Sequence, residues 1–154
     1  MRVYTVNFNG VAVTAQQDLF EIVAAAGKPC RIVALQLSQS TEVGDAQEEG
    51  LNVILKAGQS ASGSGGSTAT PVPLNSTDAA AGFTAEVNNT SKAASGTIVT
   101  HDAFSWNVRA PFIFIWPPEM RIELTGSRRF TVELGSTPPD SITMSGTLYV
   151  EEIG

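Results

Sequence analysis

The residues of this chain that could carry out covalent or proton-transfer chemistry are few. The only cysteine is Cys30, and the only histidine, His101, is followed directly by Asp102. His101 and Asp102 could form half of an acid–base pair, but a nucleophilic cysteine would need such groups beside it. Cys30 lies instead in an apolar stretch with Ile32 and Leu35, which predicts a small buried side chain. The sequence therefore predicts a protein that is not an enzyme.

A second chemical feature is an acidic stretch, residues 41–50, that has no hydrophobic periodicity. It contains Asp45, Glu48 and Glu49, whose carboxylate oxygens could bind Ca²⁺. The spacing is not that of an EF-hand, so we expect a solvated acidic loop. The Gly/Ser-rich segment 57–73 is not followed by Lys-Thr or Lys-Ser and does not match a phosphate-binding loop. We predict neither a metal nor a cofactor.

Charge and composition narrow the classes of partner. The net charge is −6, and charged residues make up only 16% of the chain, below the ~25% usual in globular domains. Nucleic-acid binding needs a basic surface, and anionic membranes attract basic segments, so we expect neither partner. No stretch approaches the ~18 apolar residues of a membrane span, and the first residues lack the apolar region of a signal peptide. We therefore expect synthesis and folding in a cytoplasm.

The elements that must position these residues are short strands. Apolar residues recur at every second position in about nine or ten segments, with turn signals every ~8–12 residues. The alternation is clearest at 104–108, 130–134 and 142–150, and in the two arms that flank the acidic stretch, 33–38 and 51–56. No amphipathic helix is evident. The sequence predicts an all-β protein with one domain, residues 1–154, folded as an antiparallel, jelly-roll-like β-sandwich.

Two segments are expected to interrupt the strands. Asn9 and Gly10 form a dipeptide typical of tight hairpins, which predicts a turn between strands at 3–8 and 11–14. Residues 57–73 contain a long run of Ser and Gly. Such a composition buries too little apolar surface to fix its own conformation. We therefore expect a flexible loop at about 57–73.

One expected strand, residues 112–116, has no polar face. Phe112, Phe114 and Trp116 point to one side, and Ile113 and Ile115 point to the other. A strand of an antiparallel sandwich normally has one wet face, so one side fills the core and the other must be covered. Burying two isoleucines is worth roughly 3–6 kcal/mol. We expect a second copy of the chain to cover them; a central strand buried within one chain and a carbohydrate-binding platform are the alternatives.

Three blocks of sequence resemble a group of small proteins encoded with the virion genes of tailed bacteriophages. The blocks are LSQS at 37–40 with VGDA at 43–46, DAAAGFTAEVNNT at 78–90 and SGTLYVEE at 145–152. Similar small all-β proteins are head decoration, or cement, proteins. The resemblance implies a jelly-roll-like sandwich without catalytic residues, often a homotrimer, on the outer surface of the capsid where major capsid subunits meet.

The resemblance also implies two partners, the major capsid protein and further copies of this chain. Because the sheets are occupied by the protein's own core, we expect exposed segments to contact the shell. The candidates are the N-terminal arm and the acidic loop, with residues Arg2, Val3, Tyr4, Asp45, Glu48 and Glu49. One alternative is a receptor- or carbohydrate-binding sandwich of a phage tail or fibre, which exposure of Trp106 and Trp116 in a groove would favour. Another is a structural component of the neck or tail.

Overall fold

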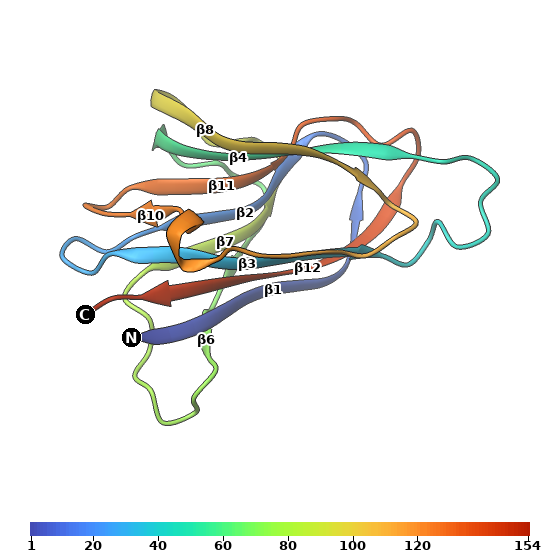
Figure 1. The fold of residues 1–154 in the computed structure, drawn as a ribbon. Coiled ribbons are helices and arrows are strands. Elements are labelled where there is room, and N and C mark those ends of the chain that lie inside the picture. Colours follow the sequence, from blue (N-terminus) through green and yellow to red (C-terminus); the bar gives the residue numbers. More distant parts are fainter.

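The computed structural model describes the whole chain, residues 1–154, as two six-stranded antiparallel sheets packed face to face (Figure 1). In sheet A the strands follow the order β6 (Val72–Pro73), β1 (Arg2–Val13), β12 (Ile142–Glu152) and β3 (Cys30–Gln39), and both β9 (Phe112–Ile115) and β10 (Glu123–Leu124) pair with β3. In sheet B the order is β5 (Ser67–Ala69), β7 (Thr84–Asn89), β2 (Gln17–Val23), β11 (Arg129–Leu134), β4 (Gly50–Ala61) and β8 (Ala94–Asn107). The one helix, η1 (Pro118–Met120), is far too short to cross a membrane.

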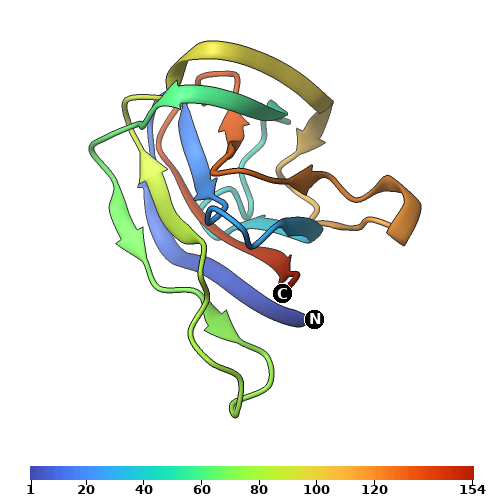
Figure 2. The same cartoon turned by 90° about the vertical axis from the view of Figure 1, so that its left-hand side faces the viewer.

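The order of the strands is that of a jelly roll. Sheet A runs β1, β12, β3, β9, and sheet B runs β2, β11, β4, β8. The first strand therefore lies beside the last, and the second beside the last but one, which is the arrangement of two Greek keys folded together. β5, β6 and β7 belong to an insertion between β4 and β8, and they extend both sheets on the side opposite β8 and β9 (Figure 2). The predicted all-β antiparallel sandwich is confirmed.

The core lies between the sheets and is built by the two-residue period of the strands. In β12, the side chains of Ile142, Met144, Leu148 and Val150 are fully buried, while the residues between them, apart from Gly146, are partly exposed. Each such side chain stabilises the fold by about 1.5–3 kcal/mol. Of the 32 buried apolar residues, 31 form one cluster, so the two sheets share a single core.

The predicted hairpin at Asn9 and Gly10 is wrong. β1 continues through both residues and remains paired with β12, with a shift of register between Phe8 and Val11. Gly10 has a φ of +65°, and its N–H donates to the Ser145 hydroxyl at 3.0 Å. The one extra residue of β1 is therefore absorbed as a β-bulge rather than as a chain reversal.

The flexible loop predicted at 57–73 is also wrong. β4 continues to Ala61, and both β5 and β6 fall within the segment. Its glycines permit close backbone approach. A Cβ atom on Gly63 would lie 2.6 Å from the carbonyl oxygen of Ser91, and one on Gly66 would lie 2.2 Å from that of Val87. The glycines therefore let the segment lie directly against β7 and the turn that follows it.

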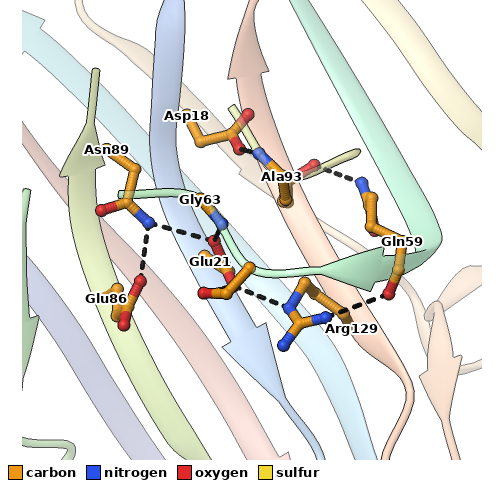
Figure 3. A network of polar contacts seen from close by, with 10 residues as sticks. Asp18, Glu21, Gln59, Gly63, Glu86, Asn89, Ala93 and Arg129 are labelled. Carbon is orange, nitrogen blue, oxygen red and sulfur yellow. Dashed lines mark hydrogen bonds and ion pairs between the residues drawn. The ribbon is translucent and has the colours of Figure 1, made fainter. Parts of the chain in front are cut away.

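A buried carboxylate, that of Glu21 in β2, holds this segment on sheet B (Figure 3). It accepts hydrogen bonds from the Ser62 hydroxyl at 2.8 Å and from the backbone N–H of Gly63 at 2.9 Å. It also accepts from the Asn89 amide at 3.0 Å and pairs with the Arg129 guanidinium at 2.7 Å. Hydrogen bonds to charged groups are roughly twice as strong as neutral ones. The Gly/Ser-rich segment is thus ordered by polar contacts rather than by burial of apolar side chains.

Candidate functional site

One side of the sandwich is left open by the two strands that end the sheets there. β8 pairs only with β4, and β9 pairs only with β3. The connection through residues 108–111 keeps the two strands on the same side, where the rings of Phe104 and Phe112 stack 4.2 Å apart across the gap between the sheets. We call this side, residues 94–116, the open edge (Figure 1).

The open edge gathers exposed apolar side chains. Six of the ten large hydrophobic residues exposed on the protein belong to it or to η1, which follows it, and the largest exposures on β9 are those of Ile113 (60%) and Ile115 (67%). The six are Ile98, Val99, Ile113, Phe114, Ile115 and Met120. Contiguous exposed apolar surface marks binding sites on soluble proteins, and an unpaired edge strand offers free backbone groups to another chain.

The predicted split of the segment 112–116 into two sides is present, with one difference. Trp116 is buried and Phe112 packs on Phe104, so the aromatic side does face inward. Phe114, however, is 38% exposed, because β9 is a sheet edge and not the central buried strand considered as an alternative. Phe112, Phe114 and Trp116 line a cleft of about 250 Å³ between the sheets, together with Asp102 and Phe104. Its mostly apolar lining suits a hydrophobic side chain of a partner.

The N-terminal arm predicted to reach the capsid is not free. Arg2–Val13 forms β1, which is paired with β12 and with β6. Tyr4 is fully buried, its hydroxyl donates to the carbonyl of Ala79 at 2.9 Å, and its ring meets Phe83 edge to face. Val3 accepts a backbone hydrogen bond from Leu74 at 2.9 Å. The prediction of an exposed arm made of Arg2, Val3 and Tyr4 is therefore wrong, because both edges of the strand are occupied and Tyr4 fills the core.

The acidic loop is divided between exposed and buried carboxylates. Glu48 is exposed and Asp45 is half-buried, but Glu49 is buried, so the prediction of a fully solvated loop is wrong. Glu42 and Asp140, which the sequence analysis did not select, bring their carboxylates to those of Asp45 and Glu49. These four residues are the ones whose side chains could hold a metal ion. Asp140 lies in the connection between β11 and β12, and no spacing in the sequence signals its approach.

The residues considered for catalysis lie in different surroundings. Cys30 is fully buried in β3, and burial raises the pKa of its thiol to about 12, with a smaller effect from the charge of Glu152. His101 lies on the exposed part of β8, where partial desolvation and then the charge of Arg128 lower its pKa. The Asp102 carboxylate accepts from the backbone N–H of Ala103 at 2.8 Å. The thiol is thus a protonated core side chain at neutral pH.

A concavity of about 380 Å³, which we call the polar groove, lies on the outer face of sheet A beside β9. Half of its twelve lining residues carry uncharged amides or hydroxyls. The polar lining residues are Asn7, Asn9, Gln36, Ser38, Ser145 and Thr147. Such groups are good hydrogen-bonding partners for a neutral polar ligand.

Comparison of the chain with protein-family models, with curated proteins and with solved structures found no match. The jelly-roll topology is shared by viral capsid proteins and by lectins, and a fold alone does not determine a function. The open edge, the acidic loop and the polar groove are thus the features from which a function can be inferred.

Proposed function

We propose that this chain is a non-enzymatic structural protein of a tailed bacteriophage, a decoration protein that binds the outer surface of the capsid and stabilises it. The observation that supports this proposal most is the open edge. Natural sheets usually blunt an edge with short strands, prolines or charges, whereas β8 and β9 present a long strand and exposed isoleucines. A protein that functions by binding its neighbours in a shell needs such a surface, whereas the same surface on a free monomer promotes aggregation.

The same edge supports self-association into a homotrimer. Ile113 and Ile115 lie on the outer face of β9, where no part of the chain covers them, and closed symmetry lets each copy present one such edge to the next. The major capsid protein is the second partner. Its contacts belong to the surfaces that remain exposed in the trimer, which include Glu48 in the acidic loop.

The test is the location of the protein in purified virions. Heads and tails of the phage that carries the gene are separated on a density gradient, and each fraction is analysed by quantitative mass spectrometry. We expect the protein in the heads, in a copy number comparable to that of the major capsid protein, with immunogold label outside the shell. Its presence only in tails or necks, or its absence from particles, would overturn the proposal.

A second candidate function rests on the polar groove of sheet A. Its amide and hydroxyl lining suits a neutral sugar, as expected for a carbohydrate-binding module of a tail or fibre. Trp106 and Trp116, whose exposure would favour this function, are both only 3% exposed, and the Trp106 indole donates to the carbonyl of Ala110 at 2.6 Å. A glycan array with saturable binding that Gln36→Ala abolishes would favour this candidate over the first.

A further inference from the structure

Four carboxylates meet at one end of the sandwich. Glu42, Asp45 and Glu49 come from the connection between β3 and β4, and Asp140 comes from the connection between β11 and β12. One oxygen from each lies within 4.8 Å of the others. We call these residues the acidic cluster. Two loops far apart in the sequence thus place their negative charges at one point.

Glu49 shows that this is more than a solvated acidic surface. The residue is only 5% exposed, and its Oε2 is buried without a hydrogen-bond partner. Glu42, at 6% exposed, is also buried. A buried carboxylate without a partner is strongly unfavourable, and nearly all buried polar atoms in native proteins are paired. The orphaned oxygen of Glu49 therefore points to a ligand that supplies positive charge.

The protein itself supplies no such charge. None of its seven ion pairs includes a residue of the acidic cluster. Arg109, in the connection between β8 and β9, donates instead to the backbone carbonyls of Asp45 and Gln47. Burial raises the pKa of Glu49, and the three neighbouring carboxylates raise it further. The repulsion among the four charges is thus uncompensated within the chain.

The backbone around the acidic cluster is fixed by contacts that leave the Glu49 carboxylate free. The carbonyl of Glu49 accepts from the N–H of Val108 at 3.1 Å, and the N–H of Glu42 donates to the Gln39 side chain at 2.8 Å. Arg109 holds the middle of the loop, as described above. The frame therefore holds the carboxylates together against their repulsion, which is the preorganisation expected of a binding site.

We propose that the acidic cluster is a Ca²⁺ site, with Glu42, Asp45, Glu49 and Asp140 as the protein ligands. A set of carboxylate oxygens without His or Cys suits a hard cation. Ca²⁺ binds oxygens at about 2.3–2.6 Å in flexible geometry, so ligands on opposite sides of the ion lie about 5 Å apart, whereas Mg²⁺ demands about 2.1 Å and strict octahedral geometry. Four oxygens within 4.8 Å of one another have spacings that one Ca²⁺ ion can span. The ion would tie the β3–β4 loop to the β11–β12 loop.

The test is isothermal titration calorimetry of the full chain with CaCl₂, in about 0.15 M NaCl so that diffuse attraction between surface charges is screened. We expect one ion per chain, weaker binding of MgCl₂, and a melting temperature that rises by about 5–10 °C at a hundredfold excess of Ca²⁺ over Kd. Glu49→Gln should weaken binding of Ca²⁺ at least about tenfold. Even the loss of a group that only supports a metal ligand usually weakens binding by this factor or more. Asp140→Asn, at an exposed position, should do the same.

Glu48→Gln is the matched control, because Glu48 lies in the same loop and carries the same charge but is exposed and outside the acidic cluster. It should leave the affinity for Ca²⁺ within about twofold, the size of a surface charge effect. No saturable binding to the wild-type chain would overturn the proposal, as would an equal loss in Glu48→Gln and Asp140→Asn. Tighter binding of Mg²⁺ than of Ca²⁺ would overturn the assignment of the ion. Should Glu49→Gln fail to fold, Asp140→Asn alone decides.

Discussion

The two sides of the sandwich end their sheets in opposite ways. On one side, which we call the closed edge, the last strands are β5 and β6, of three and two residues, and Pro71 and Pro73 remove backbone donors there. On the other side lies β8, with 14 residues and no proline, beside β9 and its exposed isoleucines. The closed edge follows the rules by which monomeric sheets avoid pairing. The open edge is therefore not a general property of this fold but is specific to one side of the sandwich.

The two edges also differ in what holds them. At the closed edge, the buried carboxylate of Glu21 anchors the segment after β4, and that of Glu152 accepts the N–H groups of Gly82 and Phe83 at 2.6 and 3.2 Å. No ion pair includes a residue of β8 or β9. The rings of Phe104 and Phe112 stack across the open edge. Buried carboxylates therefore hold the closed edge, whereas β8 and β9 of the open edge take part in no ion pair.

The largest expected effect comes from removing the anchor of the closed edge. Glu21→Ala leaves the largely buried Arg129 guanidinium without its carboxylate, and breaking a buried pair in this way costs about 3–5 kcal/mol. Urea denaturation measures the loss, and limited proteolysis should cut the segment 61–66. Glu123→Ala is the control: its pair with Arg31 has a similar distance of 2.8 Å but side chains 45% and 38% exposed, so we expect 0–1 kcal/mol. Equal losses would mean that Glu21 is not the anchor.

A second prediction concerns the carboxylate that fixes the point where β8 begins. Asp18 is buried, its Oδ2 accepts from the N–H of Ala93 at 2.7 Å, and its Oδ1 has no partner. Burial, more than any other cause, raises its pKa to about 7. Between the unfolded pKa of about 4 and this value, the folded state binds a proton that the unfolded state has released. The contribution of Asp18 to stability is therefore fully present below about pH 4 and is lost as the pH rises to 7, by up to about 4 kcal/mol.

Asp18→Asn tests this pH dependence, because the amide oxygen can still accept from Ala93 but does not titrate. Urea unfolding of both proteins at several pH values should show a flatter profile for the variant. The raised pKa of Glu49 acts in the same direction and leaves a residual slope. Identical profiles for the two proteins would show that Asp18 is ionised at neutral pH in the folded state.

The third prediction concerns the exposed isoleucines of the open edge. Ile113→Asp with Ile115→Asp places charges on the open edge, as natural edge strands do. Because both side chains are exposed, we expect the free energy of unfolding to change by no more than about 0.5 kcal/mol. Light scattering should show a fall from about three chains to one, as closed symmetric association is lost. Leu74→Asp, at a residue 62% exposed beside the closed edge, should leave the oligomer intact. A monomeric wild-type chain would remove self-association in free solution from the proposal.

The strands were predictable where one side chain in two is buried by the protein itself. Ile142, Met144, Leu148 and Val150 alternate cleanly and lie in the core. The open edge was visible in part, since a strand with no polar face implies a missing partner. Its position at the end of a sheet was not, because strand order depends on contacts such as that of Leu35 with Phe114, which are remote in sequence.

The wrong predictions have one physical cause. The contacts that fix these segments come from residues that are distant in the sequence. The Gly/Ser-rich segment contains little apolar surface, and its order depends on Glu21, which precedes it by some forty residues. Glu49 and Asp140 approach each other only because two loops share one end of the jelly roll. Tyr4 was assigned to a free arm because its strand partner, β12, is the last strand of the chain.

The last prediction concerns the contact that joins the two sheets at the open edge. In a double-mutant cycle, Phe104→Ala and Phe112→Ala should couple by about 0.5–1.5 kcal/mol, the usual worth of an aromatic pair beyond its buried area. The matched cycle at the closed edge uses Tyr4→Phe and Phe83→Ala, whose rings meet edge to face at 5.6 Å. There the coupling should be smaller, because Tyr4→Phe keeps the ring and removes only the hydrogen bond to Ala79. A coupling near zero between Phe104 and Phe112 would mean that the stack adds nothing beyond the burial of each ring. In that case only contacts with a bound partner would hold β8 and β9 in place. Amide exchange in β8 should then be faster in the free chain than in the assembled protein.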